Sequence, residues 1–221
     1  MGFEYLTNVP LAQARKEYLE RLVSGGFGSK TETIPVFESC GRVTAKAVYA
    51  HICAPHYAAS AMDGVAVSAK ETFGATETTP VTLKPDQFLV LDTGDPIPED
   101  KDAVIMVEDI VKNGDGSITI HAAAAPWQHI RQIGEDICAG EMILPSHMTV
   151  SPAPIGAMIA GGVLEIEVIR KPVVGIIPTG DEIIPPCTDP KPGDILEFNG
   201  SIFSAMVRSW GAEAVVYPIV P

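Results

Sequence analysis

Basic residues are scarce in this chain. Its 221 residues include 15 Lys and Arg against 28 Asp and Glu, which gives a formal net charge of -13. A protein this acidic repels nucleic acid and anionic membrane surfaces, so we expect neither as a partner. No apolar run approaches the roughly 20 residues that a membrane-spanning helix needs. No secretory signal opens the sequence either.

Cysteine is also rare. Cys40, Cys53, Cys138 and Cys187 are far apart in the sequence and lack the paired spacing of a metal site. Without a secretory signal, we expect them to be reduced thiols in a cytoplasmic protein. The chain has no P-loop, no Rossmann glycine fingerprint, and no Gly-x-Ser-x-Gly or His-Glu-x-x-His motif. Any chemistry therefore depends on carboxylates, threonine hydroxyls, arginine and backbone amides.

Apolar residues make up 46% of the chain, which is enough for a sizeable core. With 20 Gly and 19 Pro, the composition favours short strands joined by turns. Apolar spacing predicts helices at 10–23 and 155–160, and a third that begins with Asn199 as its N-cap and ends at Gly211. Short strands fill the rest, and Asn113-Gly114-Asp115-Gly116 between two of them indicates a hairpin.

These patterns predict an α+β multidomain protein. Residues 1–50 and 141–170 form a mixed first domain, and 51–140 form an all-β module inserted into it. Residues 171–221 form one β-loop-α-β unit, the beginning of an α/β three-layer domain. Because a single unit of roughly 50 residues cannot cover its own sheet, we expect this last domain to be incomplete.

Carboxylates stand beside glycines in three tight turns, at residues 60–64, 134–136 and 179–182, and a further turn begins at Thr93. Asp63, in Ser60-Ala61-Met62-Asp63-Gly64, either shapes its own turn or presents an acid to a ligand or cation. Thr93, which begins Thr93-Gly94-Asp95-Pro96, either belongs to a plain rigid loop or donates its hydroxyl to a phosphate.

Arg131 is followed by Gly134-Glu135-Asp136. Its guanidinium either binds a phosphate or carboxylate ligand through two hydrogen bonds, or only pairs with Glu135 or Asp136 on the surface.

The third turn, Thr179-Gly180-Asp181-Glu182, directly follows an apolar strand. Ligands of open α/β sheets bind at the carboxyl ends of strands, and two adjacent acids can coordinate Mg²⁺ that carries phosphate oxygens. We therefore expect Thr179, Gly180 and Asp181 to contact substrate.

Over residues 5–221 the chain resembles the molybdopterin molybdotransferases, the MoeA-type proteins, whose relatives include the E domain of gephyrin. The motifs that carry the resemblance occur in that family's order: Ser60-Ala61-Met62-Asp63-Gly64, Thr93-Gly94 with Pro96 and Pro98, Asp102-Ala103-Val104, Arg131 with Gly134-Glu135-Asp136-Ile137, and Thr179-Gly180-Asp181-Glu182.

The resemblance implies insertion of molybdate into adenylated molybdopterin, with Mg²⁺, in an elongated homodimer that releases AMP and molybdenum cofactor. It implies catalytic roles for Asp63, Asp136 and Glu182, and substrate binding by Thr93 and Arg131. Which acids hold Mg²⁺ stays open.

The family's glycine-rich loops and C-terminal barrel do not follow Pro221 in this sequence, so we expect the chain to be a fragment that is inactive alone. Asp95 also departs from the family's usual Ala and adds a negative charge beside an anion-handling loop. The alternative is a dimerising or molybdate- or pterin-sensing module without turnover.

Overall fold

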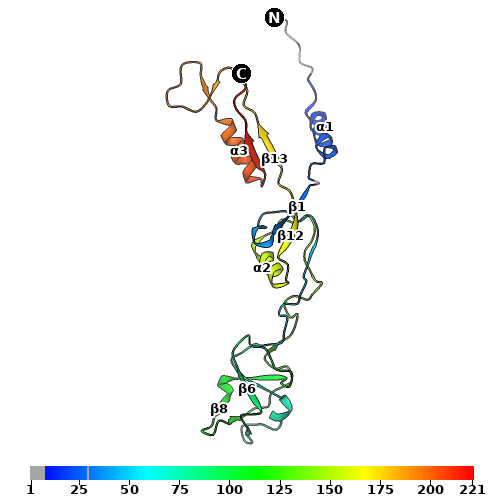
Figure 1. The fold of residues 1–221 in the computed structure, drawn as a ribbon, viewed down its shortest axis with the longest axis vertical. Helices are drawn as coiled ribbons and strands as arrows, with labels where there is room; N and C mark the ends of the chain where they lie inside the picture. Colours follow the sequence, from blue (N-terminus) through cyan, green and yellow to red (C-terminus); the bar gives the residue numbers. More distant parts are fainter. Residues whose placement is uncertain (1–7, 29) are drawn as a thin grey trace. The chain divides into compact units, whose positions relative to one another are not determined.

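The computed structural model describes residues 8–28 and 30–221, and it divides into two compact units (Figure 1). The first unit contains the chain up to Ala47, Leu144–Ile155 and Glu165–Pro221, and the second contains Val48–Ile143 and Gly156–Leu164. The described residues form a mixed structure of mostly short strands with three α-helices. None of the helices in these ranges is long and apolar enough to cross a membrane.

The first unit begins with helix α1 (Leu11–Ser24), which follows Pro10 and is capped by Gly25. This confirms the helix expected at 10–23. Strand β1 (Thr31–Pro35) leads into a short 3-10 helix (Val36–Glu38) and pairs antiparallel with β12 (Glu165–Ile169), far along the sequence. Residues 42–49 contribute only isolated bridges at Val43 and Thr44 and, where the second unit begins, the two-residue strand β2 (Val48–Tyr49).

Beyond residue 171, β13 (Val173–Ile176) pairs in parallel with β16 (Glu213–Val216), and helix α3 (Asn199–Ser209) connects to β16 and packs on both strands. Between them, β14 (Ile183–Ile184) and β15 (Ile195–Leu196) form a second parallel pair. The sequence therefore predicts the order of elements in this segment correctly.

The cap of α3 differs from the expectation. Phe198 holds the N-cap position, and Asn199 is already helical. Glu197 supplies the missing acceptor, because the Gly200 N–H donates to its Oε1 at 2.6 Å. A carboxylate at this end also interacts favourably with the helix dipole. The prediction of an Asn199 cap is thus wrong by one residue, and an acid replaces it.

In the second unit, the regular secondary structure of Val48–Ile143 consists of strands and 3-10 helices, which are joined by turns and loops. Strand β4 (Gly64–Val67) is the centre of one sheet, between β6 (Phe88–Leu91) and β7 (Ala103–Met106). A second sheet has the order β5 (Val81–Leu83), β9 (Ile118–Ile120), β8 (Ile110–Lys112). The remaining strands of this part of the chain are β2, β3 (Ala59–Ser60), β10 (Ile130–Arg131) and β11 (Met142–Leu144), and the 3-10 helices are η2 (Ala69–Thr72) and η3 (Val107–Asp109).

The two sheets enclose one core of buried residues, which includes Val65, Val67, Leu83, Ile105 and Ile120. Because the core lies between two different sheets, residues 103–111 do not form a single strand. The chain bends through η3 and enters the second sheet as β8. The predicted hairpin is confirmed: β8 and β9 pair antiparallel, and the Asn113 N–H donates to Ser117 O at 2.9 Å.

Gly64 allows β4 to lie at the centre of its sheet. A Cβ at this position would stand 2.0 Å from the backbone oxygen of Ile105 on the neighbouring strand. The residue after Asp63 is therefore fixed as glycine by backbone contact, whatever the role of the acid.

We predict that Gly64→Ala lowers the free energy of unfolding by about 1–3 kcal/mol, because the new methyl group must push β4 away from β7. Gly114→Ala is the matched control, since a Cβ there meets nothing within 4 Å. Urea unfolding followed by circular dichroism measures both. Equal midpoints for the two variants would contradict the tight packing of β4 against β7.

Candidate functional site

Ser60 connects the segments that carry the predicted site residues of the second unit. It is fully buried and pairs with Ile130 across β3 and β10. On its other side, its N–H donates to Asp95 O, and its carbonyl accepts from the Gly94 N–H, both at 2.9 Å. Its hydroxyl donates to Met62 O at 2.6 Å. One small residue thus joins the 60–64 turn, the 93–97 turn and β10.

Asp63 is held against the second of these turns. Its Oδ1 accepts hydrogen bonds from both the backbone N–H and the hydroxyl of Thr93, each at 2.7 Å. Asp63 therefore bridges to a turn 30 residues away instead of closing its own. The Thr93 hydroxyl, for which donation to a phosphate was one of two roles considered from the sequence, donates to this carboxylate.

These bonds lower the pKa of Asp63 from its ordinary value, first through the Thr93 hydroxyl and then through the Thr93 backbone N–H. Desolvation opposes the shift weakly. The carboxylate is consequently charged throughout the neutral pH range. Because both bonds converge on Oδ1, the second oxygen stays directed elsewhere and is available to a ligand.

Arg131 forms the second local pair. Its Nη2 donates to Asp136 Oδ2 at 2.6 Å, and its Nε lies 3.6 Å from Glu135 Oε1. Asp136, together with Glu135, raises the pKa of Arg131 further above its ordinary value. The surface pairing considered from the sequence is therefore present. Since Arg131 is only partly buried and both acids are exposed, an anionic ligand can compete with them for the guanidinium.

The Asp63–Thr93 pair and the Arg131–Asp136 pair lie on neighbouring segments joined by backbone pairing, an arrangement that we call the ladder. Arg131 stands opposite Ala59 on β3, and Ala59 also bridges to Pro96. Asp63 follows the same strand, and Thr93 begins the turn that contains Pro96. Four of the predicted site residues thus come from three adjacent segments, and Tyr57 ties them further by donating its hydroxyl to Gly94 O at 3.0 Å.

Thr179, Gly180, Asp181 and Glu182 belong to the other compact unit. They follow β13 at its carboxyl end, where Thr179 bridges to Val220 and the Gly180 N–H donates to Val220 O at 3.0 Å. Gly180 has φ 144°, a conformation that favours glycine. Asp181 and Glu182 are both exposed there.

The carboxylates of the described ranges are dispersed. Within these ranges, no three His, Cys, Asp or Glu side chains come close enough to hold a metal ion. Asp63 and Asp136 each offer carboxylate oxygen, the donor that Mg²⁺ prefers. Mg²⁺ that is bound together with phosphate groups needs only one or two protein carboxylates, and Asp63 and Asp136 meet that requirement. They do not form a cage in which protein groups alone bind the metal.

The family model of the MoeA N-terminal region (domain I and II) matches residues 9–162. The chain belongs to this family. It is 36% identical over 199 residues to the molybdopterin molybdenumtransferase 2 of Mycobacterium tuberculosis, which covers 83% of this chain and 49% of the relative. With the molybdopterin molybdenumtransferase of Haemophilus influenzae the identity is 30% over 223 residues, covering 96% and 54%.

Solved MoeA structures have the same fold. A crystal structure of the molybdopterin biosynthesis MoeA protein from Pyrococcus horikoshii aligns with a TM-score of 0.76 and 31% identity, covering 87% of this chain and 55% of that one. A second structure of that protein aligns with a TM-score of 0.79 over 96% of this chain and 57% of that one. This MoeA-type chain therefore spans about half the length of the relatives that it matches.

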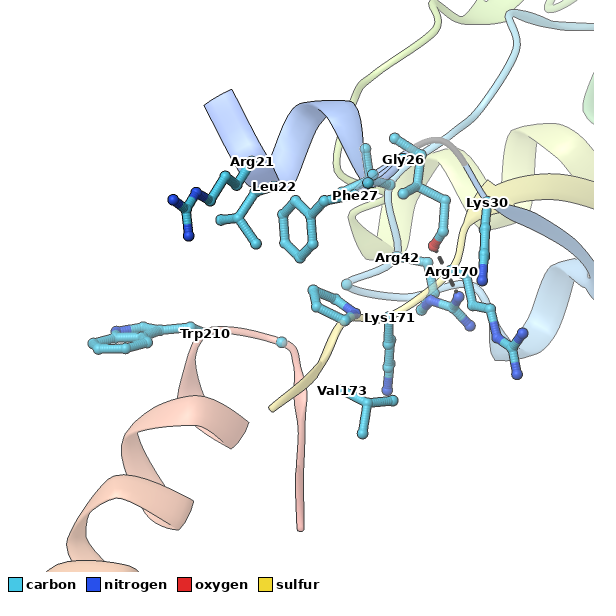
Figure 2. A pocket seen from close by; sticks show the side chains of 17 residues that line it. Arg21, Leu22, Gly26, Phe27, Lys30, Arg42, Arg170, Lys171, Val173 and Trp210 are labelled. Atoms are coloured by element: carbon cyan, nitrogen blue, oxygen red, sulfur yellow. Dashed lines mark hydrogen bonds between the residues drawn. The ribbon is translucent and has the colours of Figure 1, made fainter. Parts of the chain in front are cut away.

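The first unit of this MoeA-type chain contains a cavity of about 770 Å³ between the end of α1, the start of β13 and the end of α3 (Figure 2). Its lining includes Arg21, Lys30, Arg42, Arg170 and Lys171. Figure 2 shows Arg21 on one side and Lys30, Arg42 and Arg170 on the other, with Phe27 between. Arg42 already pairs with Glu32 and donates to Ile169 O. These cations do not converge on one point, and the cavity lies at the opposite end of β13 from Thr179.

Ser60 and Tyr57 were missed as site residues by the sequence analysis. Ser60 begins the motif Ser60-Ala61-Met62-Asp63-Gly64, and the signal that could have identified it is a small polar residue just before Asp63. Tyr57 has no such signal, because its partner lies 37 residues away.

We predict that Thr93→Val raises the pKa of Asp63 toward its ordinary value, because the variant removes the largest stabilising bond of the carboxylate. An NMR titration of the Asp63 carboxyl carbon measures the change. Thr78→Val removes an exposed threonine hydroxyl elsewhere in the unit and should leave the Asp63 titration unchanged.

The sign of the pH effect follows from the lowered pKa. The bond stabilises the fold above the unfolded pKa of Asp63, and this contribution disappears as the pH falls through the folded value. An identical Asp63 titration in wild type and Thr93→Val would contradict the assignment.

Proposed function

We propose that this chain supplies part of the site of a molybdenum cofactor biosynthesis enzyme that inserts molybdate into adenylated molybdopterin and releases AMP. The family membership supports the proposal, and so do the names of the relatives, which are molybdopterin molybdenumtransferases. The single observation that carries it is the ladder that joins Asp63, Thr93, Arg131 and Asp136. It places two carboxylates and a guanidinium on adjacent segments of a protein from this family.

The proposal includes the domain plan. Residues 51–140 are an all-β module inserted between 1–50 and 141–170, and 171–221 begin an α/β domain. The compact unit around Val48–Ile143 and the parallel β13–β16 pair support this plan. We further propose a cytoplasmic homodimer, in which the module of one subunit faces the α/β domain of the other.

Arg131 binds an oxyanion in this account. Molybdate and the phosphates of adenylated molybdopterin are anions, and a guanidinium contacts such oxygens through paired charged hydrogen bonds. In the structure Asp136 occupies Nη2 at 2.6 Å. An arriving oxyanion replaces this contact, and Asp136 is then free to accept a proton or to hold a cation beside the ligand.

Asp63 acts as a fixed charge. The Thr93 bonds orient its carboxylate and lower its pKa, so that it stays ionised beside the reacting phosphate. Thr179 and the Gly180 and Asp181 amides contact substrate from the α/β side, and Glu182 is the third catalytic acid. Carboxylates from this set would hold Mg²⁺, which would supply positive charge beside the phosphates.

The test uses a chimera in which residues 9–221 of this chain are joined to the remaining half of the Haemophilus influenzae relative. We expect molybdate-dependent AMP release from adenylated molybdopterin. Asp63→Asn and Asp136→Asn should each reduce kcat about 100-fold or more, the usual cost of removing a charged group that stabilises a transition state.

Asp86→Asn is the matched control for these variants. It removes an exposed carboxylate of the same unit that lies outside the proposed site, and AMP release should be unchanged. Full activity of both site variants would refute the residue roles. A chimera that binds molybdate or pterin without releasing AMP would instead favour the sensing module.

A further inference from the structure

Two of the four cysteines are brought together by strand register. Ala54 and Ile137 exchange two backbone hydrogen bonds, from Ala54 N to Ile137 O at 2.8 Å and from Ile137 N to Ala54 O at 3.0 Å. In an antiparallel ladder the next pair outward has no such bonds and its Cα atoms approach to about 4.5 Å. Cys53 and Cys138 are that next pair, so their side chains share one face.

Gly134 makes room for both sulfur atoms. A Cβ on Gly134 would lie 3.1 Å from Cys138 Sγ and 3.4 Å from Cys53 Sγ, so both sulfurs adjoin the same point. The φ of Gly134 is 75°, a conformation that L side chains rarely adopt. The Ala139 N–H donates to Cys53 Sγ at 3.3 Å, and Cys138 Sγ donates to Gly134 O at 3.4 Å. The backbone of one turn therefore orients both thiols.

The pair is open to reagents. Cys138 is exposed and Cys53 is half-buried, and neither is bonded to another cysteine. Cys40 and Cys187 are exposed too, but both belong to the other compact unit. Two thiols thus face each other, and the remaining two serve as internal controls.

We propose that Cys53 and Cys138 form a reversible disulfide when the protein meets a small-molecule disulfide such as oxidised glutathione. The Cys138 thiolate attacks one sulfur of the reagent and expels one small thiolate, which takes up a proton. The Cys53 thiolate then attacks Cys138 Sγ and expels the second. The two protein thiols lose two electrons and two protons, and the reagent is reduced to two thiols.

The position of the bond gives it two consequences. Cys53 and Cys138 lie near the beginning and the end of Val48–Ile143, so the disulfide closes nearly all of that segment into a loop and restricts its unfolded state. It also fixes the turn that carries Glu135 and Asp136, the acids that pair with Arg131. Oxidation therefore stabilises the second unit and stiffens the partners of Arg131.

The experiment treats the wild-type chain with oxidised glutathione, blocks free thiols with iodoacetamide in denaturant, and maps tryptic peptides by mass spectrometry. Each cysteine lies in a different tryptic peptide, because Lys or Arg residues separate all four. We expect one cross-linked peptide pair that contains Cys53 and Cys138, its loss on addition of dithiothreitol, and Cys40 and Cys187 either alkylated or singly glutathionylated, in no cross-link.

Alkylation of all four cysteines, or a cross-link that involves Cys40 or Cys187 instead, would overturn the proposal. Thermal unfolding gives an independent reading in a Cys40→Ser, Cys187→Ser background. There oxidation should raise the unfolding midpoint, and adding Cys53→Ser should abolish the rise. An oxidised protein that melts no higher than the reduced one would overturn the structural consequence.

Discussion

The hydrogen bonds of buried Ser60 are the constraint on which the candidate site depends. Its main chain serves two neighbours at once, β10 on one side and the Gly94–Asp95 turn on the other. Its hydroxyl closes the turn toward Met62, so no polar group of the side chain is left unsatisfied. A larger residue would not fit this fully buried position, and a residue without a hydroxyl would leave Met62 O without its partner. The placement of Asp63, Thr93 and Arg131 follows from this one junction.

The acidic side chains around that junction each have a local partner. In a chain with a net charge of -13, an unpaired Asp63 or Asp136 would repel an anionic ligand. Thr93 directs two dipoles at Asp63, and Arg131 neutralises Asp136 and Glu135. The exposed ion pair adds little to stability. We propose instead that it holds a guanidinium where a stronger anion can displace the exposed carboxylates.

Local features of the fold were predictable from the sequence, and long-range ones were not. Apolar spacing and the flanking Pro10 and Gly25 were sufficient for α1, and the Asn113–Gly116 turn was sufficient for its hairpin. The Arg131–Asp136 pair was foreseeable because five residues separate its members. The bond from Thr93 to Asp63 and the Cys53–Cys138 pair arise from strand pairings between distant segments, which composition and spacing do not specify. The bend at Val107–Asp109 could not be predicted from the sequence for a related reason. It is required only by the core that forms between the two sheets.

The central claim is that Arg131 holds an oxyanion at this ladder. Equilibrium dialysis of molybdate against the chain tests it most directly, with Arg131→Gln compared with Arg208→Gln, which removes an exposed guanidinium from α3 in the other unit. We predict that Arg131→Gln raises the Kd for molybdate about tenfold or more, since a charged hydrogen bond contributes about 1.5–3 kcal/mol. Arg208→Gln should bind like the wild type. Equal molybdate affinity in wild type and Arg131→Gln would contradict the claim.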